Sequence, residues 1–327
     1  MLHNGGMSTR LYTLSVLATG GLLLAIHFLT PLPLAGQSAV KLDPRSRAED
    51  LSDIPRPDIR TDSQMVLIPV SVNDPLGRPV SGLSKKNFEV TDNGEAQSIS
   101  AFFRDDEPIA LALVLDISGS MKGLLPQARR AATYFITSAN DGDQFTLVEF
   151  STDPEVSVPL TNDLEHVRYE LLFNDSDGET ALIDAVYLGI TELQKSALRR
   201  KAMIVVSDGG DNNSRYTLPE LRDIVREANV LIYSVGIRSN QSNIALLRSF
   251  SEDTGGRTFD TIMGMGGLQD IAQKIAVDLR NRYVLGYVPT DRARDGLYHK
   301  VELTLKVPRG LPRLTTYWRK GYYAPTE

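Results

Sequence analysis

Three oxygen-bearing side chains stand at alternate positions where an apolar segment ends. Residues 111–115 read LALVL, and Asp116, Ser118 and Ser120 follow them. A loop that curls around one point would direct all three side chains toward that point. Carboxylate and hydroxyl oxygens are hard ligands, which suit Mg²⁺ or Mn²⁺ better than zinc. The spacing therefore indicates a site for a divalent cation.

A second acid ends a second apolar segment. Asp208 follows KAMIVVS, much as Asp116 follows IALALVL. Ligands of an open α/β sheet bind beyond the carboxyl ends of its strands, so both acids are expected at that edge. A buried carboxylate without a partner is costly, and a cation would relieve the cost. Two acids with several neutral hydroxyls would leave a bound divalent ion able to take one more carboxylate from a partner.

The segment DISGSM, residues 116–121, is similar to the metal-ion-dependent adhesion site of von Willebrand factor type A (VWA) domains. That pattern continues with a mid-chain Thr, matched by Thr180 in DSDGETALIDAV, and a later Asp, matched by Asp208 in VVSDGGDN. There are two departures: Ser207 stands where Thr is common, and Glu179 where Gly is common. The resemblance implies a bound Mg²⁺, or Mn²⁺ or Ca²⁺, and a protein partner that presents an Asp or Glu carboxylate. The implied metal ligands are Asp116, Ser118, Ser120, Thr180 and Asp208.

Each of these hydroxyls also has an ordinary structural interpretation. Ser118 and Ser120 could cap a helix that begins a few residues later, and Thr180 could cap the helix that follows it. Ser176 could replace Thr180 as the mid-chain hydroxyl. The joint match of all five positions, in the right order, favours the metal site over the caps.

The elements around the site define the fold class. Between 107 and 282, apolar strands alternate with amphipathic helices, which predicts an α/β domain with a mostly parallel sheet covered on both faces. The resemblance of DISGSM implies that this domain has the Rossmann-like VWA fold. Residues 65–106 and 283–327 alternate with period two instead, and Asp-Asn-Gly at 92–94 is a strong hairpin signal. Neither flank is long enough for a stable unit, so we predict one small β-sandwich built from both chain ends. These flanks resemble the exported bacterial "VWFA-related" proteins.

The N-terminus predicts export. Arg10 precedes an uncharged apolar run at 11–29, and small residues follow, which is the order of a secretory signal. The run is also close to the roughly 20 residues that span a bilayer, so an uncleaved signal-anchor is the alternative. We expect a signal or anchor at 1–38 and a polar, proline-containing linker at 39–64. The remainder would be secreted or periplasmic, or held at a membrane through the N-terminal segment alone.

Composition and missing motifs exclude several functions. The net charge of −6 argues against nucleic-acid binding, and the absence of cysteine excludes disulfides and thiol chemistry. No phosphate-binding loop or G-x-S-x-G motif occurs, so we expect a binding protein and not an enzyme. Two alternatives remain. The metal may only stabilise the loops of a scaffold that binds through its sandwich, or the protein is a metal-dependent hydrolase with Asp116 as nucleophile.

Two further groups of residues are interpreted as structural. Arg199, Arg200 and Lys201 read as a solvated helix face near a helix end. The aromatic residues near the C-terminus are expected to pack within strands and not to form a ligand stack. They are Tyr317, Trp318, Tyr322 and Tyr323.

Overall fold

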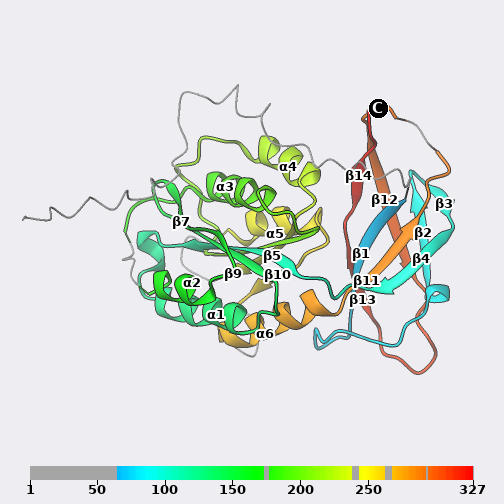
Figure 1. The fold of residues 1–327 in the computed structure, drawn as a ribbon, viewed down its shortest axis with the longest axis horizontal. Helices are drawn as coiled ribbons and strands as arrows, with labels where there is room; N and C mark the ends of the chain where they lie inside the picture. Colours follow the sequence, from blue (N-terminus) through cyan, green and yellow to red (C-terminus); the bar gives the residue numbers. More distant parts are fainter. Residues whose placement is uncertain (1–64, 173–176, 238–242, 262–266, 292–293, 327) are drawn as a thin grey trace, which may run out of the picture. The chain divides into compact units, whose positions relative to one another are not determined.

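The structure is a computed structural model, and Figure 1 shows the path of its chain. The expected signal or anchor (1–38), the linker (39–64) and Ser176 lie outside the residues that it describes. Within the described part, no helix has the length and apolar character needed to cross a membrane. The described residues are 65–172, 177–237, 243–261, 267–291 and 294–326.

A six-stranded sheet forms the centre of the α/β domain. Its order is β10-β9-β8-β5-β6-β7; the first five strands run parallel, and β7 is an antiparallel edge strand. Every residue of β5 is buried, as expected for a continuous apolar strand covered on both faces. The strands are β5 (Ile109–Asp116), β6 (Gln144–Phe150), β7 (Pro154–Thr161), β8 (Arg200–Ser207), β9 (Leu231–Gly236) and β10 (Thr258–Asp260).

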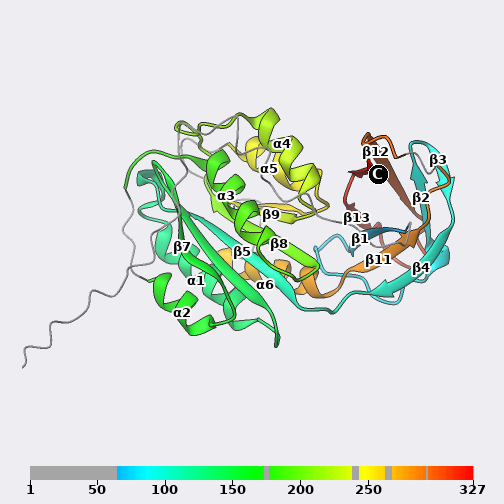
Figure 2. The same cartoon turned by 45° about the horizontal axis from the view of Figure 1, so that its top comes forward.

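Helices cover both faces of this sheet, which confirms the predicted fold class. One apolar core contains residues of α1, α2 and α6, and the other contains residues of α3, α4 and α5 (Figure 2). The helix α4 opens with a capping box between Thr217 and Glu220. The helices are α1 (Leu125–Thr137), α2 (Leu164–Glu170), α3 (Leu182–Gln194), α4 (Leu218–Glu227), α5 (Ile244–Glu252) and α6 (Gly267–Arg280).

Both chain ends contribute to a β-sandwich, as predicted. Its two sheets have the orders β13-β1-β11-β4 and β14-β12-β2-β3, and their apolar side chains share one core. The expected hairpin joins β2 to β3 through Asn93 and Gly94, both with positive φ. The strands are β1 (Val66–Asn73), β2 (Phe88–Asp92), β3 (Glu95–Gln97), β4 (Ile99–Arg104), β11 (Tyr283–Tyr287), β12 (Tyr298–Leu305), β13 (Thr315–Trp318) and β14 (Gly321–Tyr323).

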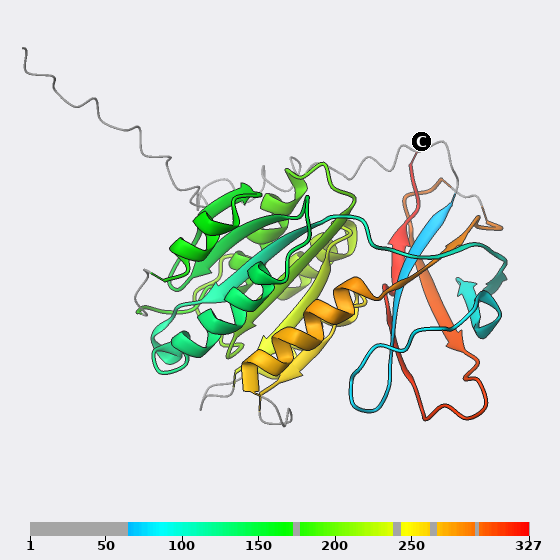
Figure 3. The same cartoon turned by 60° about the horizontal axis from the view of Figure 1, so that its bottom comes forward.

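Helix α6 continues directly into strand β11 (Figure 3), and a buried polar network surrounds this connection. The carboxylate of Asp278 accepts hydrogen bonds from the Ser71 hydroxyl, from the Asn73 amide at 3.3 Å and from the Tyr233 hydroxyl at 2.5 Å. The guanidinium of Arg282 donates to the Tyr233 hydroxyl at 3.2 Å. The network therefore ties the last helix of the α/β domain to the first strand of the sandwich.

The interpretation of the basic run at 199–201 is wrong. Arg200 begins strand β8, and α3 has already ended at Gln194. The guanidinium of Arg200 pairs with the carboxylate of Asp105 at 3.1 Å, and burial lowers the pKa of Arg200. Sequence alone suggested a helix end because the basic residues follow a helical pattern, but their neighbours in the chain enter the sheet.

Candidate metal centre

The two predicted acids lie side by side at the carboxyl edge of the sheet. Asp116 is the last residue of β5, and Asp208 directly follows β8, which is paired with β5 in parallel. Their side chains are 0% and 1% exposed. Asp208 is close enough for its charge to raise the pKa of Asp116. Adjacent parallel strands thus bring together two acids that are 92 positions apart in the sequence.

Asp116 is a buried carboxylate held by neutral donors. It accepts the backbone N–H of Ser118 at 2.9 Å and the hydroxyl of Ser207 at 2.6 Å. Burial is the largest cause that raises the pKa of Asp116, and the nearby Asp208 carboxylate adds to it, while the hydrogen bonds act in the opposite direction. No Lys, Arg or His of the described residues forms an ion pair with Asp116. No ion pair with a described residue therefore balances the negative charge of Asp116.

The two loop serines do not cap helices, so that interpretation is wrong for them. Ser118 precedes the short 3₁₀ turn η3 (Gly119–Met121), and its side chain makes no capping hydrogen bond there. The next helix, α1, has Leu124 at its N-cap, again without a side-chain cap. The hydroxyl oxygens of Ser118 and Ser120 lie 3.2 Å apart, so both are on the same side of the loop.

Thr180 does not cap a helix either. The N-cap of α3 is Ala181, and the Thr180 side chain makes no hydrogen bond to any described residue. Its backbone is held instead: the N–H donates to the side-chain oxygen of Asn212 at 2.9 Å. The carbonyl of Thr180 accepts the backbone N–H groups of Asn212 and Asn213, at 3.0 and 3.1 Å. The hydroxyl of Thr180 is thus positioned without a structural role of its own.

Asp211 is the residue that caps α3. Its carboxylate accepts the N–H of Leu182 at 2.9 Å and that of Ile183 at 3.3 Å. The hydroxyl of Ser214 donates to the same carboxylate at 2.5 Å. A free N–H at a helix start needs such an acceptor, and Asp211 supplies it from a different loop.

Sequence reasoning missed three supporting residues: Ser207, Asp211 and Asn212. All three lie in the run SDGGDN, residues 207–212, directly around the predicted Asp208. Ser207, noted only as a departure from the usual Thr, supplies a hydroxyl to Asp116. The density of short polar side chains after a buried strand was the available signal. The sequence does not show to which backbone groups these side chains form hydrogen bonds.

The loop before Thr180 is attached through its backbone to the loop that carries Ser118 and Ser120. Gly119 donates its N–H to the carbonyl of Gly178 at 3.2 Å, and Asp177 donates to the carbonyl of Ile117 at 3.0 Å. Gly178 has a φ of +88°, and a side chain there would meet the Thr152 hydroxyl at 2.6 Å. Glycine is therefore required at this contact. Glu179 is exposed to solvent, so the acid that replaces the common Gly is not buried against the site.

The donor set fits a hard divalent ion. The described residues contain no group of three or more His, Cys, Asp or Glu side chains that could hold a metal. An ion at this edge would therefore depend on two carboxylates supplemented by the hydroxyls of Ser118, Ser120 and Thr180. Such an all-oxygen set suits Mg²⁺, Mn²⁺ or Ca²⁺, and the negative charge at Asp116 is what a cation would neutralise.

Comparison with known proteins identifies the family to which the α/β domain belongs. Residues 110–274 match the model of the von Willebrand factor type A domain, which confirms the resemblance derived from DISGSM. A curated relative, an uncharacterized protein of Borreliella burgdorferi, is 28% identical over 141 residues, covering 40% of this chain and 41% of that protein. The chain thus matches about two fifths of the length of that relative.

Two solved structures are similar in fold. A von Willebrand factor type A protein from Catenulispora acidiphila is 13% identical with a TM-score of 0.48, covering 81% of this chain and 75% of that one. Proximal thread matrix protein 1 from the mussel byssus, with a zinc-occupied MIDAS motif, is 17% identical with a TM-score of 0.47, covering 57% and 48%. At these values the likeness carries no functional detail to this chain.

Proposed function

Because this chain belongs to the von Willebrand factor type A family, whose domains generally mediate protein–protein interactions, we propose that it binds protein partners through a divalent ion. The ion is of the Mg²⁺ class, Mn²⁺ and Ca²⁺ included. A partner contributes an Asp or Glu carboxylate. The residues that hold the ion are Asp116, Ser118, Ser120, Thr180 and Asp208.

The observation that carries this proposal is the electrostatic state of Asp116. Its carboxylate is fully buried, has the acidic Asp208 as a neighbour, and has no ion pair with a described residue. An isolated buried charge is strongly unfavourable, and bringing a second carboxylate close makes it worse. A divalent cation would supply a positive charge that no described residue brings to Asp116 through an ion pair.

The surrounding residues hold this arrangement ready for a ligand. Ser207 and the backbone of Ser118 fix both oxygens of Asp116, while Asn212 fixes the backbone of Thr180. Such supporting hydrogen bonds orient metal ligands before the ion binds. When bound, the ion supplies an electrophilic centre for a partner carboxylate. Two acids and neutral hydroxyls leave it with the residual charge for that contact.

The first experiment is thermal melting of the protein from residue 39 onward in EDTA, Mg²⁺, Mn²⁺ or Ca²⁺. A metal at 100 times its dissociation constant stabilises the folded state by about 2.7 kcal/mol. In a domain of this size, that corresponds to a rise in Tm of roughly 5–10 °C. The metal that gives the largest rise is the preferred ion, and Asp116→Ala removes the rise.

A matched control is Asp153→Ala. Asp153 is an exposed acid at the same edge of the sheet, in the turn between β6 and β7, and its side chain makes no ion pair with a described residue. This variant keeps the metal-dependent rise in Tm. An equal rise in Asp116→Ala and the unmodified protein would contradict the site.

Selection of displayed random peptides on the immobilised protein tests the partner. With the preferred ion present, we expect enriched peptides that contain Asp or Glu, are released by EDTA and are not retained by Asp116→Ala. Metal-dependent stabilisation together with peptides that ignore EDTA would favour the scaffold alternative, in which the ion only stabilises the loops. In that case the β-sandwich would be the surface to test for partner binding.

The absence of enzymatic activity is also part of the proposal. A hydrolase with Asp116 as nucleophile would need a second acid two positions later to handle the proton, and that position is Ser118. We expect no Mg²⁺-dependent turnover of generic phosphoesters or esters. Turnover that Asp116→Asn abolishes would establish the hydrolase instead. Export through the segment at 11–29 is proposed on the sequence alone and is testable by fractionation of cells.

A further inference from the structure

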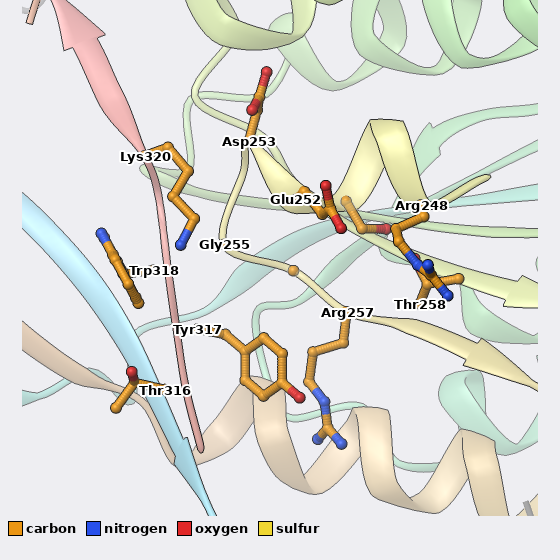
Figure 4. A pocket seen from close by; sticks show the side chains of 12 residues that line it. Arg248, Glu252, Asp253, Gly255, Arg257, Thr258, Thr316, Tyr317, Trp318 and Lys320 are labelled. Carbon is orange, nitrogen blue, oxygen red and sulfur yellow. The ribbon is translucent and has the colours of Figure 1, made fainter. Parts of the chain in front are cut away.

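A pocket of about 470 Å³ lies between the end of α5, strand β10 and the edge strand β13 (Figure 4). One wall comes from the α/β domain and the other from strand β13 of the sandwich and Lys320, which follows it. The backbone is close at one point, because a side chain on Gly255 would meet the backbone carbon of Trp318 at 2.4 Å. Gly255 also has a φ of +79°. The pocket is therefore a built feature of this junction.

Positive charge predominates in the pocket. Arg248, Arg257 and Lys320 line it, and none of the three forms an ion pair with a described residue. Two acids line it as well, but Asp253 already pairs with Arg226 at 2.9 Å, outside this lining. Glu252 is the remaining acid and is exposed. In a chain whose net charge is −6, this local excess of cations is unusual.

The guanidinium of Arg257 is fixed by aromatic rings. Its central carbon lies 4.6 Å from the centroid of the Phe259 ring and 4.9 Å from that of the Tyr317 ring. One of its nitrogens, Nη1, is buried and has no hydrogen-bond partner in the described part of the chain. Rings against a guanidinium reduce its hydration without cancelling its charge. The charge of Arg257 is thus available to an anion.

Lys320 presents a second charge from the opposite wall. Its ammonium nitrogen lies 3.2 Å from the centroid of the Trp318 ring, and its backbone N–H donates to the carbonyl of Asp253 at 3.1 Å. Figure 4 shows this side chain directed toward the pocket. Trp318 is the one tryptophan in the sequence. In Figure 4 the Arg257 guanidinium points away from Lys320, with the Tyr317 ring between them, so an anion beside Lys320 would be attracted by the charge of Arg257 without contacting it.

We propose that this pocket binds a small ligand through a phosphate or carboxylate group, which contacts Lys320 and is also attracted by the positive charges of Arg248 and Arg257. A volume of this size accommodates a small organic molecule, and the ring of Tyr317 offers a face for an apolar part. A lysine ammonium attracts either oxyanion as a point charge, and the nearby guanidinium groups add to that attraction. The site is separate from the metal centre and does not depend on a bound ion.

The fluorescence of Trp318 reports directly on this site. We would titrate the purified protein, in EDTA and at constant ionic strength, with inorganic phosphate, phenyl phosphate and benzoate, and repeat each titration by calorimetry. A saturable change in emission is expected for at least one probe. Comparing phenyl phosphate with benzoate identifies the preferred oxyanion, and inorganic phosphate measures the contribution of the aromatic part.

Charge-removing variants test the named residues. Lys320→Gln should weaken binding about tenfold, the effect of losing one charged hydrogen bond, and Arg257→Gln should weaken it less, because Arg257 acts through its charge alone. Lys306→Gln is the matched control, because Lys306 is an exposed lysine of the sandwich that pairs with Glu89, and it should bind like the unmodified protein. No saturable signal by either method up to about 10 mM would overturn the proposal. So would equal affinity in Lys320→Gln, a variant whose fold can be checked by its melting curve.

Discussion

Two regions of the molecule bury an aspartate, and they treat it in opposite ways. At the domain junction, Asp278 accepts hydrogen bonds from the side chains of Ser71, Asn73 and Tyr233, and Arg282 lies behind the tyrosine. At the edge of the sheet, Asp116 accepts hydrogen bonds from Ser118 and Ser207, and it has an acidic neighbour and no ion pair with a described residue. Burial of an acid is thus no sign of a binding site. The balance of charge around the acid is what distinguishes the two.

The largest effect is expected from Asp278→Ala. The substitution leaves the Tyr233 hydroxyl without its acceptor, and it removes the carboxylate that lies behind this hydroxyl from Arg282, which is 3% exposed. We expect the free energy of unfolding to fall by about 3 kcal/mol in urea denaturation. The control is Asp270→Ala on the same helix, whose partly exposed pair with Lys274 should matter by less than about 0.5 kcal/mol. Equal losses in both variants would remove the contrast between the two buried acids.

Asp116→Asn should shift stability in the other direction. In EDTA it removes a buried charge beside Asp208 and keeps an acceptor for the Ser118 N–H, so we expect a gain of about 1 kcal/mol. The same variant should lose the stabilisation by metal. Denaturation curves with and without metal measure both effects. A loss of stability in EDTA would mean that Asp116 is structural, as Asp278 is.

Asn212→Ala tests whether the supporting loop positions the site. It removes the acceptor for the Thr180 N–H, and we expect metal affinity to fall about tenfold, with a loss of stability near 1 kcal/mol. Asn212→Asp retains the acceptor oxygen and should recover most of the affinity. Metal titration followed by calorimetry separates the two quantities. Unchanged affinity in Asn212→Ala would limit this residue to a structural role.

The smallest effect concerns pH at the junction pocket. Burial lowers the pKa of Lys320 below its usual 10.5; Glu252 and Asp253 oppose this shift, and Lys300 reinforces it. The protonated ammonium attracts the oxyanion, so affinity should fall as pH rises through this lowered pKa. Titrations of Trp318 fluorescence at several pH values measure it. In Lys320→Gln the pH dependence should disappear, and its persistence there would assign the effect to another group.

Much of the fold was predictable because burial imposes a pattern on the sequence. The strand IALALVLD is apolar throughout since helices cover both of its faces, whereas β12 alternates because one face of its sheet is exposed. Strand β7 and helix α2 were not predicted. Strand β7 is an edge strand that contains Pro154 and Pro159, which weaken the strand signal and are tolerated at an edge.

The candidate site was predictable to a similar extent. Asp116 and Asp208 lie close together because each ends a strand, and parallel strands share their carboxyl edge. That geometry follows from the strand pattern of the sequence alone. The helix-capping roles could not be predicted. Thr180 precedes a helix in the sequence, yet Asp211 provides the cap from a distant loop.

The sequence by itself determined the α/β class, the insertion between two β flanks and the five residues proposed to hold a metal ion. Local residue types and their spacing carry that information. Only the tertiary structure decided how the charge of each buried acid, Asp278 and Asp116, is compensated by its neighbours. The partners of Asp278 lie 45 to 207 positions away in the chain, and the two walls of the cationic pocket belong to separate domains. Charge balance depends on distances in space, and no short segment of sequence records them.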